Sequence, residues 1–442
     1  MKNRLLSDFT KYVSLNVLGM IGLSCYILAD TFFISLALGA DGLAALTLAL
    51  PAYNVIHGAG LMLGLGGATQ CAVLWARGRG HDARQTIAHT VALGLILGAL
   101  FLTAGAAFAP QLATLLGAEG AAAPLAADYL RVILCFAPCF LLNNIFLALV
   151  RNDRNPRLAM AAMLAGSLSN IVLDYVLMFP LGMGMTGAAV ATGLAPLISL
   201  GVLSAHARRR DNRLHVSRPH PSRRVAGHIF TLGFFAFVTE ASTGLVLMLS
   251  NGVILELSGN TGVAAYGIVA NLALVFLSVF TGMAQGMQPL ASRAFGQGDP
   301  QSLRRLLRYA SVLSLAAAAV GILAVNVWQD GIISAFGGGR DAWLARIAAD
   351  GLRLYFPGFL FAGFNMIAAA FLCATGRPRA GSAVSLARGF VAIVPLVLIL
   401  PRFLGMNGVW LSFGAAELIA CVPACLALGR APSSCNSSSG TL

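Results

Sequence analysis

The sequence contains few charged residues. They make up 10% of its 442 residues, whereas hydrophobic residues make up 58%. The mean hydropathy is +0.81. A soluble protein of this length needs more charge to cover its surface, so the composition excludes an ordinary soluble domain. It is typical of a protein that crosses a membrane many times.

Catalytic and metal-binding motifs are absent as well. The sequence has no HExxH zinc motif, no GxSxG nucleophile motif and no GxxxxGK[ST] nucleotide loop. Its eight cysteines form no CxxC pair, and most fall within apolar segments, where cysteine behaves as a small hydrophobic residue. We therefore expect a protein that is not an enzyme and that carries no cofactor.

Long apolar segments recur along the whole chain. A helix that spans a bilayer needs roughly 20 apolar residues. The segments are apolar on all sides, which favours helices over the short alternating strands of a barrel. The fold class that we predict is an all-α polytopic membrane protein with twelve transmembrane helices, at residues 12–37, 43–76, 86–108, 125–150, 157–180, 187–207, 228–257, 263–292, 304–327, 345–374, 380–400 and 408–429.

Basic residues are concentrated on one side of the predicted membrane. With twelve spans, 23 of the 29 lysines and arginines lie before the first span, after the last, or in the connections that follow an even-numbered span. The positive-inside rule makes that side cytoplasmic, with both termini inside. Membrane orientation thus accounts for the net charge of +13, and we expect no nucleic-acid partner.

The two halves of the chain resemble each other. Residues 128–159 align with 350–381, so that Asn143 corresponds to Asn365. The chain therefore reads as two six-helix lobes with the same orientation, related by an axis along the membrane normal, as in many transporters. We divide it into an N-terminal lobe at 1–207, a basic cytoplasmic linker at 208–227, a C-terminal lobe at 228–430 and a disordered tail at 431–442.

A few charged groups lie inside the predicted spans. The acids are Asp30, Asp174, Glu240 and Glu417, and Arg388 is the one base clearly within a span. An ionised carboxylate at mid-bilayer costs at least ~2.5–3.5 kcal/mol, so each acid needs a partner, water, a cation or a proton.

Polar oxygens accompany two of these acids. Asn170 and Asp174 are four residues apart and share a helix face, and the sixth span supplies Thr192. Together with Asp30 they form a set of hard oxygen ligands. Such a set suits Na⁺, or a pair of carboxylates that shares and releases a proton.

Four stretches carry a family resemblance. They are LADTFFISLALG (28–39), NIVLDYVLMFPLGMGMTGAAVATGLA (170–195), AAYGIVANLALVFLSVFTGMAQGMQPLASRAFGQGD (264–299) and LPRFLGMNGVW (400–410). With them the chain resembles the multidrug and toxic compound extrusion (MATE) family, in its bacterial multidrug-efflux branch, over residues 8–430. The resemblance implies that organic cations or other amphipathic compounds are exported in exchange for H⁺ or Na⁺.

The resemblance also implies which residues act. It places a cation- or proton-coupling site, with Na⁺ as one candidate ion, at Asp30, Asn170, Asp174 and Thr192. Glu240 matches an acid of the C-terminal lobe that serves coupling or substrate binding. The other aromatic and amide side chains that we expect in the substrate pocket are Phe33, Tyr53, Asn143, Phe276, Phe280 and Gln288.

The nearest alternative is a flippase for lipid-linked saccharides of the same superfamily. Such flippases often have several cationic residues in the central cavity, whereas Arg388 stands alone here. The sequence lacks the motifs of an intramembrane enzyme, and a channel would suit a symmetric pore better than two divergent lobes. We expect a monomer in a bacterial inner membrane, with small-molecule drugs or organic cations and membrane lipid as its partners. The sequence leaves H⁺ and Na⁺ both open as the coupling ion.

Overall fold

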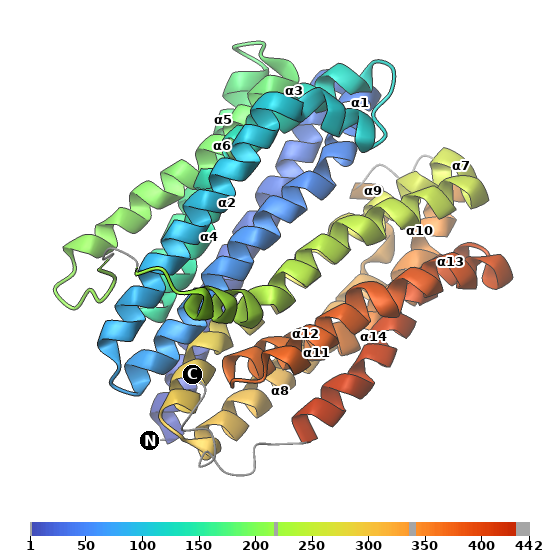
Figure 1. Ribbon diagram of the computed structural model, residues 1–442. Helices are drawn as coiled ribbons and strands as arrows, with labels where there is room; N and C mark the ends of the chain where they lie inside the picture. The colour runs from blue at the N-terminus through green and yellow to red at the C-terminus, as the bar shows by residue number, and fades with distance from the viewer. Residues whose placement is uncertain (1, 216–219, 336–341, 430–442) are drawn as a thin grey trace.

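The described part of the protein is almost wholly helical (Figure 1). The computed structural model describes residues 2–215, 220–335 and 342–429, and no β-strand occurs within these ranges. The tail predicted at 431–442 and residues 216–219 of the predicted linker lie outside the described residues.

The first lobe contains six membrane spans. The first helix contains two of them, because the chain reverses direction at Gly39. Gly39 has φ 63° and ψ −145°, a conformation that glycine adopts readily and other residues rarely adopt. The third and fourth helices meet at a bend of 50° and together form one span. The elements are α1 (Lys2–Ala76), α2 (Gly80–Leu115), α3 (Ala122–Cys135), α4 (Ala137–Asn152), α5 (Pro156–Met178), α6 (Gly184–Leu203) and the 3-10 turn η1 (Ser204–Arg208).

The second lobe repeats this plan. Its first helix has 74 residues, about 110 Å at 1.5 Å per residue, and so exceeds the bilayer core of about 30 Å several-fold. A break at Gly259 (φ 61°) divides it into two spans. The elements are α7 (Arg223–Gly296), α8 (Pro300–Val327), α9 (Gln329–Ala335), α10 (Ala342–Tyr355), the 3-10 turn η3 (Phe356–Gly358), α11 (Phe359–Ala374), α12 (Pro378–Leu386), the π-helical turn η4 (Ala387–Val391), α13 (Ile393–Leu404) and α14 (Met406–Gly429).

The span count agrees with the prediction. Helices α10 and α11 form one continuous apolar span, and so do α12 and α13. With α1 and α7 each divided at a glycine, the described residues contain twelve spans, six in each lobe. The predicted loops near residues 38–42 and 258–262 do not form, because a single glycine with positive φ is enough to reverse the chain.

The internal repeat is visible in the backbone. Residues with positive φ recur at a spacing of 220–222, and they mark the same helix ends in both lobes. Arg154 is the one non-glycine among the described residues with positive φ, and its counterpart in the other lobe is a glycine. The pairs are Gly39 and Gly259, Gly78 and Gly298, Arg154 and Gly376, and Gly184 and Gly405.

The start of α8 shows how the sequence terminates one span and begins the next. Gly298 adopts φ 69°, and the Asp299 carboxylate accepts hydrogen bonds from the backbone nitrogens of Gln301 (3.1 Å) and Ser302 (3.0 Å). Pro300 then occupies the first turn, where no backbone donor is needed. The Ser302 side chain and backbone, by hydrogen bonding, lower the pKa of Asp299 from its ordinary value.

The lobes meet at one end of the molecule and diverge at the other. Figure 1 shows the blue-to-green lobe and the yellow-to-red lobe approaching each other near the N-terminal ends of α1 and α7. The largest contact between them is made by α1 and α7. Gly66 lies against the carbonyl of Ile229, and Gly233 lies against the carbonyl of Met62, so a side chain at either position would strike backbone. These two glycines let the helices pack backbone to backbone.

We predict that Gly233→Ala destabilises the contact between the lobes. The added methyl group would overlap the Met62 carbonyl, and overpacking of this kind costs about 1–3 kcal/mol. The melting temperature of the purified protein in detergent should fall by several degrees. Gly227→Ala is the matched control, since it lies on the same helix with no neighbour within 4 Å of a Cβ atom. Equal melting temperatures for both variants would contradict the close crossing.

Candidate functional site

One face of α5 is polar and buried. Ser167, Asn170 and Asp174 follow the helical repeat along that face, and Asn170 and Asp174 are fully buried. The opposite face carries Leu168 and Val172, whose side chains are 62% and 61% exposed. The helix therefore presents apolar side chains outward, where lipid would lie, and directs amide and carboxylate groups into the lobe.

The structure brings together the four residues predicted to bind the coupling ion. Asp30 comes from the first span of α1 and Thr192 from α6, and both are buried beside α5. When the Asn170 amide nitrogen faces Asp174, it lies 3.1 Å from Asp174 Oδ2, and the amide oxygen lies 3.2 Å from the Thr192 backbone nitrogen. We adopt this orientation because the opposite one would direct the amide oxygen at the carboxylate.

Two carboxylate oxygens at this site have no hydrogen-bond partner. They are Oδ1 of Asp30 and Oδ1 of Asp174, and both atoms are shielded from solvent. The two carboxyl groups are close enough to interact electrostatically. Buried acceptors without donors are costly, so this arrangement favours a bound cation or proton. No group of three or more His, Cys, Asp and Glu residues that could hold a metal occurs in the described residues.

Three tyrosines lie around this site, and of these only Tyr53 was predicted from the sequence. Tyr129 of α3 is almost wholly buried and lies near Thr192. The hydroxyls of Tyr26 and Tyr53 lie 2.9 Å apart. Nothing in the local sequence of Tyr129 distinguishes it from a core tyrosine, because its role depends on α3 packing against α6.

A pocket of about 740 Å³ adjoins the site inside the N-terminal lobe. Two of the predicted substrate-pocket residues, Tyr53 and Asn143, line it, and the Asn143 side-chain oxygen has no partner. The Tyr53 ring stacks on His57 with 5.8 Å between the ring centroids. Thr192 also lines the pocket, so the pocket reaches the ion-binding residues.

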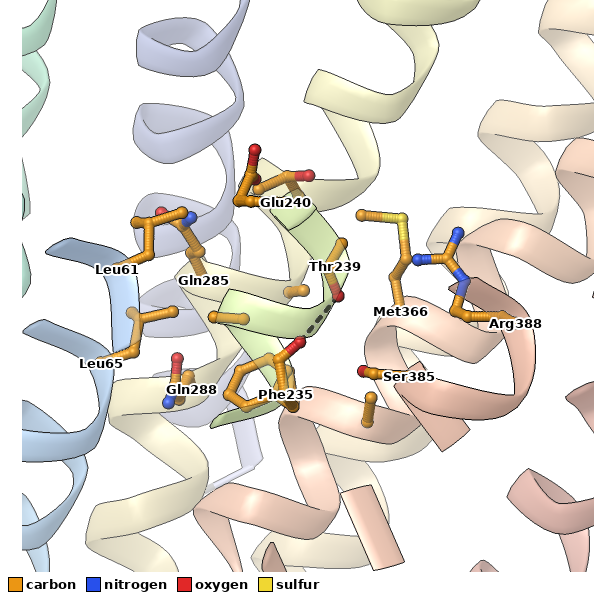
Figure 2. Close-up of a pocket in the computed structure, with 15 residues that line it drawn as sticks. Leu61, Leu65, Phe235, Thr239, Glu240, Gln285, Gln288, Met366, Ser385 and Arg388 are labelled. Carbon is orange, nitrogen blue, oxygen red and sulfur yellow. Dashed lines mark hydrogen bonds between the residues drawn. The ribbon is translucent and has the colours of Figure 1, made fainter. Parts of the chain in front are cut away.

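A second pocket, of about 470 Å³, lies between the lobes (Figure 2). Two predicted residues line it: Glu240 from the first span of α7 and Gln288 from the second. Figure 2 shows Glu240 and Arg388 on different sides of this central pocket, with Met366 beside the guanidinium. Leu61 and Gln285 line both pockets and form a shared wall.

Three predicted aromatic residues lie elsewhere. Phe33 packs against Tyr175 and Phe179 within the first lobe. Phe276 and Phe280 pack on Phe359 in the second lobe, where Phe280 is fully buried. None of the three lines either pocket. These phenylalanines fill the cores of the lobes, and sequence alone could not separate that position from a cavity wall.

The second lobe contains a buried ion pair. Arg388 donates from Nε to Glu417 Oε1 at 3.0 Å, and its Nη2 also contacts this oxygen. Asn365 donates to Glu417 Oε2 at 2.8 Å. The Glu417 charge is therefore compensated inside the protein, in contrast to the unpartnered oxygens of Asp30 and Asp174.

A buried arginine connects the two lobes. Nη1 of Arg151, at the end of α4, donates to Gln285 Oε1 of α7 at 2.9 Å and also contacts Asn16 of α1. Nearby, Gln288 of α7 donates to Thr69 of α1 at 2.7 Å. These bonds hold the lobes together on the side where the arginine-rich connections lie.

Comparison with known proteins identifies the family. The MatE family profile matches residues 17–176 and 233–398, which is most of both lobes. The chain belongs to the MatE family.

Two multidrug export proteins named MepA are among its relatives. The protein from Staphylococcus saprophyticus is 26% identical over 403 residues, covering 91% of this chain and 88% of the relative. The protein from Staphylococcus aureus strain MRSA252 is 24% identical over 408 residues, with the same two coverages.

Solved MATE structures have the same fold. An outward-facing conformation of a multidrug resistance MATE family transporter superposes with a TM-score of 0.89 at 24% identity and covers 96% of this chain and 95% of that one. A transporter of the MOP superfamily from Pyrococcus furiosus superposes with a TM-score of 0.88, also at 24% identity and with the same coverages. This MatE chain therefore has the two-lobe architecture of those transporters.

We predict that Gln285→Leu loosens the contact between the lobes. A hydrogen bond to a charged group contributes about 1.5–3 kcal/mol, so loss of the Gln285 acceptor should open this side more often. In a background whose native cysteines are replaced by serine, a cysteine introduced at the buried Ser292, one turn beyond Gln288, should then react with a maleimide about tenfold faster or more. Gln297→Leu is the control, because Gln297 is exposed. An unchanged labelling rate in Gln285→Leu would rule out a role for this bond in closure.

Proposed function

We propose that this protein exports amphipathic organic compounds, organic cations among them, across a bacterial inner membrane. Export is driven by H⁺ or Na⁺ that enters through a site at Asp30, Asn170, Asp174 and Thr192. The arginine-rich side faces the cytoplasm, in accord with the positive-inside rule. The MepA relatives, named for multidrug export, support this function.

The observation that carries the proposal is the pair of unpartnered carboxylate oxygens in the first lobe. Oδ1 of Asp30 and Oδ1 of Asp174 are buried in a membrane protein with no donor within reach. Two carboxylates in such a place bind a cation or share a proton, since both cannot remain ionised and unpaired. Loading and release of that ion changes the charge at the centre of the lobe.

The ion site and the cargo pockets are physically connected. Thr192 contacts Asn170 and also lines the pocket of the first lobe. That pocket shares Leu61 and Gln285 with the central pocket, where Glu240 offers a carboxylate to a cationic cargo. When an ion draws Asp30 and Asp174 together, the packing of α1, α5 and α6 changes, and with it the shape of both pockets. Cargo bound there is released as the ion binds.

The driving force is sufficient for this work. One elementary charge that crosses 100 mV provides ~2.3 kcal/mol. This corresponds to a gradient of roughly 50-fold in cargo for each charge moved. Exchange of ion for cargo by alternating access of the two lobes can therefore drive net export against a gradient of that size.

We predict that Asp174→Asn abolishes gradient-driven export. The substitution keeps the shape of the side chain and removes its charge, so the ion loses a ligand. Efflux of the fluorescent cation rhodamine 6G from loaded proteoliposomes should fall by about tenfold or more under the gradient that drives the natural protein, in keeping with typical coupling energies. Separate pH and Na⁺ gradients identify the ion.

Asp128→Asn provides the control for this experiment. Asp128 lies in the same lobe, but its side chain is 51% exposed and next to Arg131, so its neutralisation should leave efflux unchanged. Full-rate efflux by Asp174→Asn would refute the proposed site. If rhodamine 6G moves under neither gradient while labelled lipid-linked saccharide crosses the bilayer, the protein is a flippase instead.

A further inference from the structure

The Arg388 guanidinium has donors that no protein group uses. Glu417 accepts from Nε and Nη2 on one edge of the guanidinium. Arginine has five N–H donors in a planar fork, so both hydrogens on Nη1 and one on Nη2 remain. No acceptor for Nη1 occurs in the part of the chain that the structure describes. The side chain is nevertheless 9% exposed, so these donors are held in a fixed place.

These free donors border the central pocket. Arg388 is the one basic residue among those that line it, and Glu240 is the one acid. Figure 2 shows the guanidinium at the edge of the pocket beside Met366, apart from Glu240. The remaining lining is mostly apolar, with the amides of Gln285 and Gln288. The pocket therefore has an apolar body with one charge of each sign on separate walls.

The backbone at Arg388 is unusual as well. Residues Ala387–Val391 form a π-helical turn between α12 and α13. Such turns interrupt the regular helix and are frequent at functional sites. The turn includes Arg388 itself. Glu417 of α14 accepts a hydrogen bond from Arg388, and Asn365 of α11 donates to the same carboxylate.

The internal repeat shows what stands at the same place in the first lobe. The offset of 222 that pairs Asn143 with Asn365 also pairs Gly166 with Arg388, and the offset of 221 that pairs Gly184 with Gly405 pairs Pro196 with Glu417. Asn143, Gly166 and Pro196 all line the pocket of the first lobe. The first lobe thus has an open pocket at the place where the second lobe has the Arg388–Glu417 ion pair. The unused edge of the Arg388 guanidinium faces the central pocket.

We propose that Arg388 binds an anionic oxygen group, such as a carboxylate, on the transported compound. The group accepts from the free Nη1 and Nη2 donors while Glu417 keeps the opposite edge, since a guanidinium can bind two carboxylates at once. A cationic group on the same compound faces Glu240. The central pocket therefore prefers amphipathic zwitterions over the same molecules with the anionic group masked. This inference rests on the proposed function, because it names the class of cargo.

A matched pair of dyes tests this preference. Rhodamine 19 carries a free carboxylate beside its cationic ring system, and rhodamine 6G is its ethyl ester. Binding of each dye to the purified protein in detergent is measured by fluorescence anisotropy. We expect the Kd of rhodamine 19 to be about tenfold lower than that of rhodamine 6G, because one charge-assisted hydrogen bond strengthens binding by about that factor. A Kd that is equal for the two dyes, or lower for the ester, overturns the proposal.

The variants separate recognition from folding. Arg388→Gln combined with Glu417→Gln removes both charges, so no buried charge is left without a partner. It should raise the Kd of rhodamine 19 about tenfold and change that of rhodamine 6G less than about twofold. Arg388→Lys keeps a partner for Glu417 but loses the planar fork, and should weaken rhodamine 19 binding to a smaller extent. Arg402→Gln removes an exposed arginine of the same lobe that lines neither pocket, and should leave both Kd values unchanged.

Two outcomes distinguish this inference from the proposed function. An equal loss of both dyes in the double variant would make the ion pair structural and overturn the inference. Selective binding of rhodamine 19 without gradient-driven efflux would support Arg388 as the anion-binding residue and contradict export of these compounds. Because binding is measured without a gradient, failure of transport leaves the test intact.

Discussion

The structure depends on the cost of placing charge inside a bilayer. Water cannot screen a carboxylate there, so each buried acid must find a donor, a cation or a proton. The two lobes have the same architecture but satisfy their buried acids differently. The second lobe pairs Glu417 with Arg388 and Asn365. The first lobe leaves one oxygen on each of Asp30 and Asp174 unpartnered, so under the proposed function it is the lobe whose charge changes.

Much of the fold was predictable because the bilayer restricts the choices. Backbone groups must be satisfied within each segment, so apolar stretches of this length become helices, and the placement of the arginines on one side agrees with twelve of them. The repeat was visible in pairs such as Asn143 and Asn365. What the sequence did not reveal is how little is needed to turn the chain. Gly39 and Gly259 each reverse it within one residue, where loops were expected.

The candidate site was predictable in part. Asn170 and Asp174 share a face by spacing alone, and the family resemblance joined them to Asp30 and Thr192. The walls of the pockets were not predictable in the same way, because they depend on how helices distant in sequence cross. Phe280 and Tyr53 are both aromatic residues in apolar spans, yet one is buried in the lobe core and the other lines a pocket. Arg151 was counted with the basic connections, whereas it reaches across to Gln285 in the other lobe.

Under the proposed function, Gln285 couples a change of charge in the first lobe to the second lobe. This side chain lines both pockets and accepts from Arg151. The pocket of the first lobe extends from Arg151 to Thr192, so the ion site and the interlobe bond border the same space. A change in packing around Thr192 therefore acts on a cavity whose far wall holds the lobes together. In the proposed exchange, opening of the lobes and reshaping of the two pockets follow from one displacement, without a longer chain of contacts between the ion and the cargo.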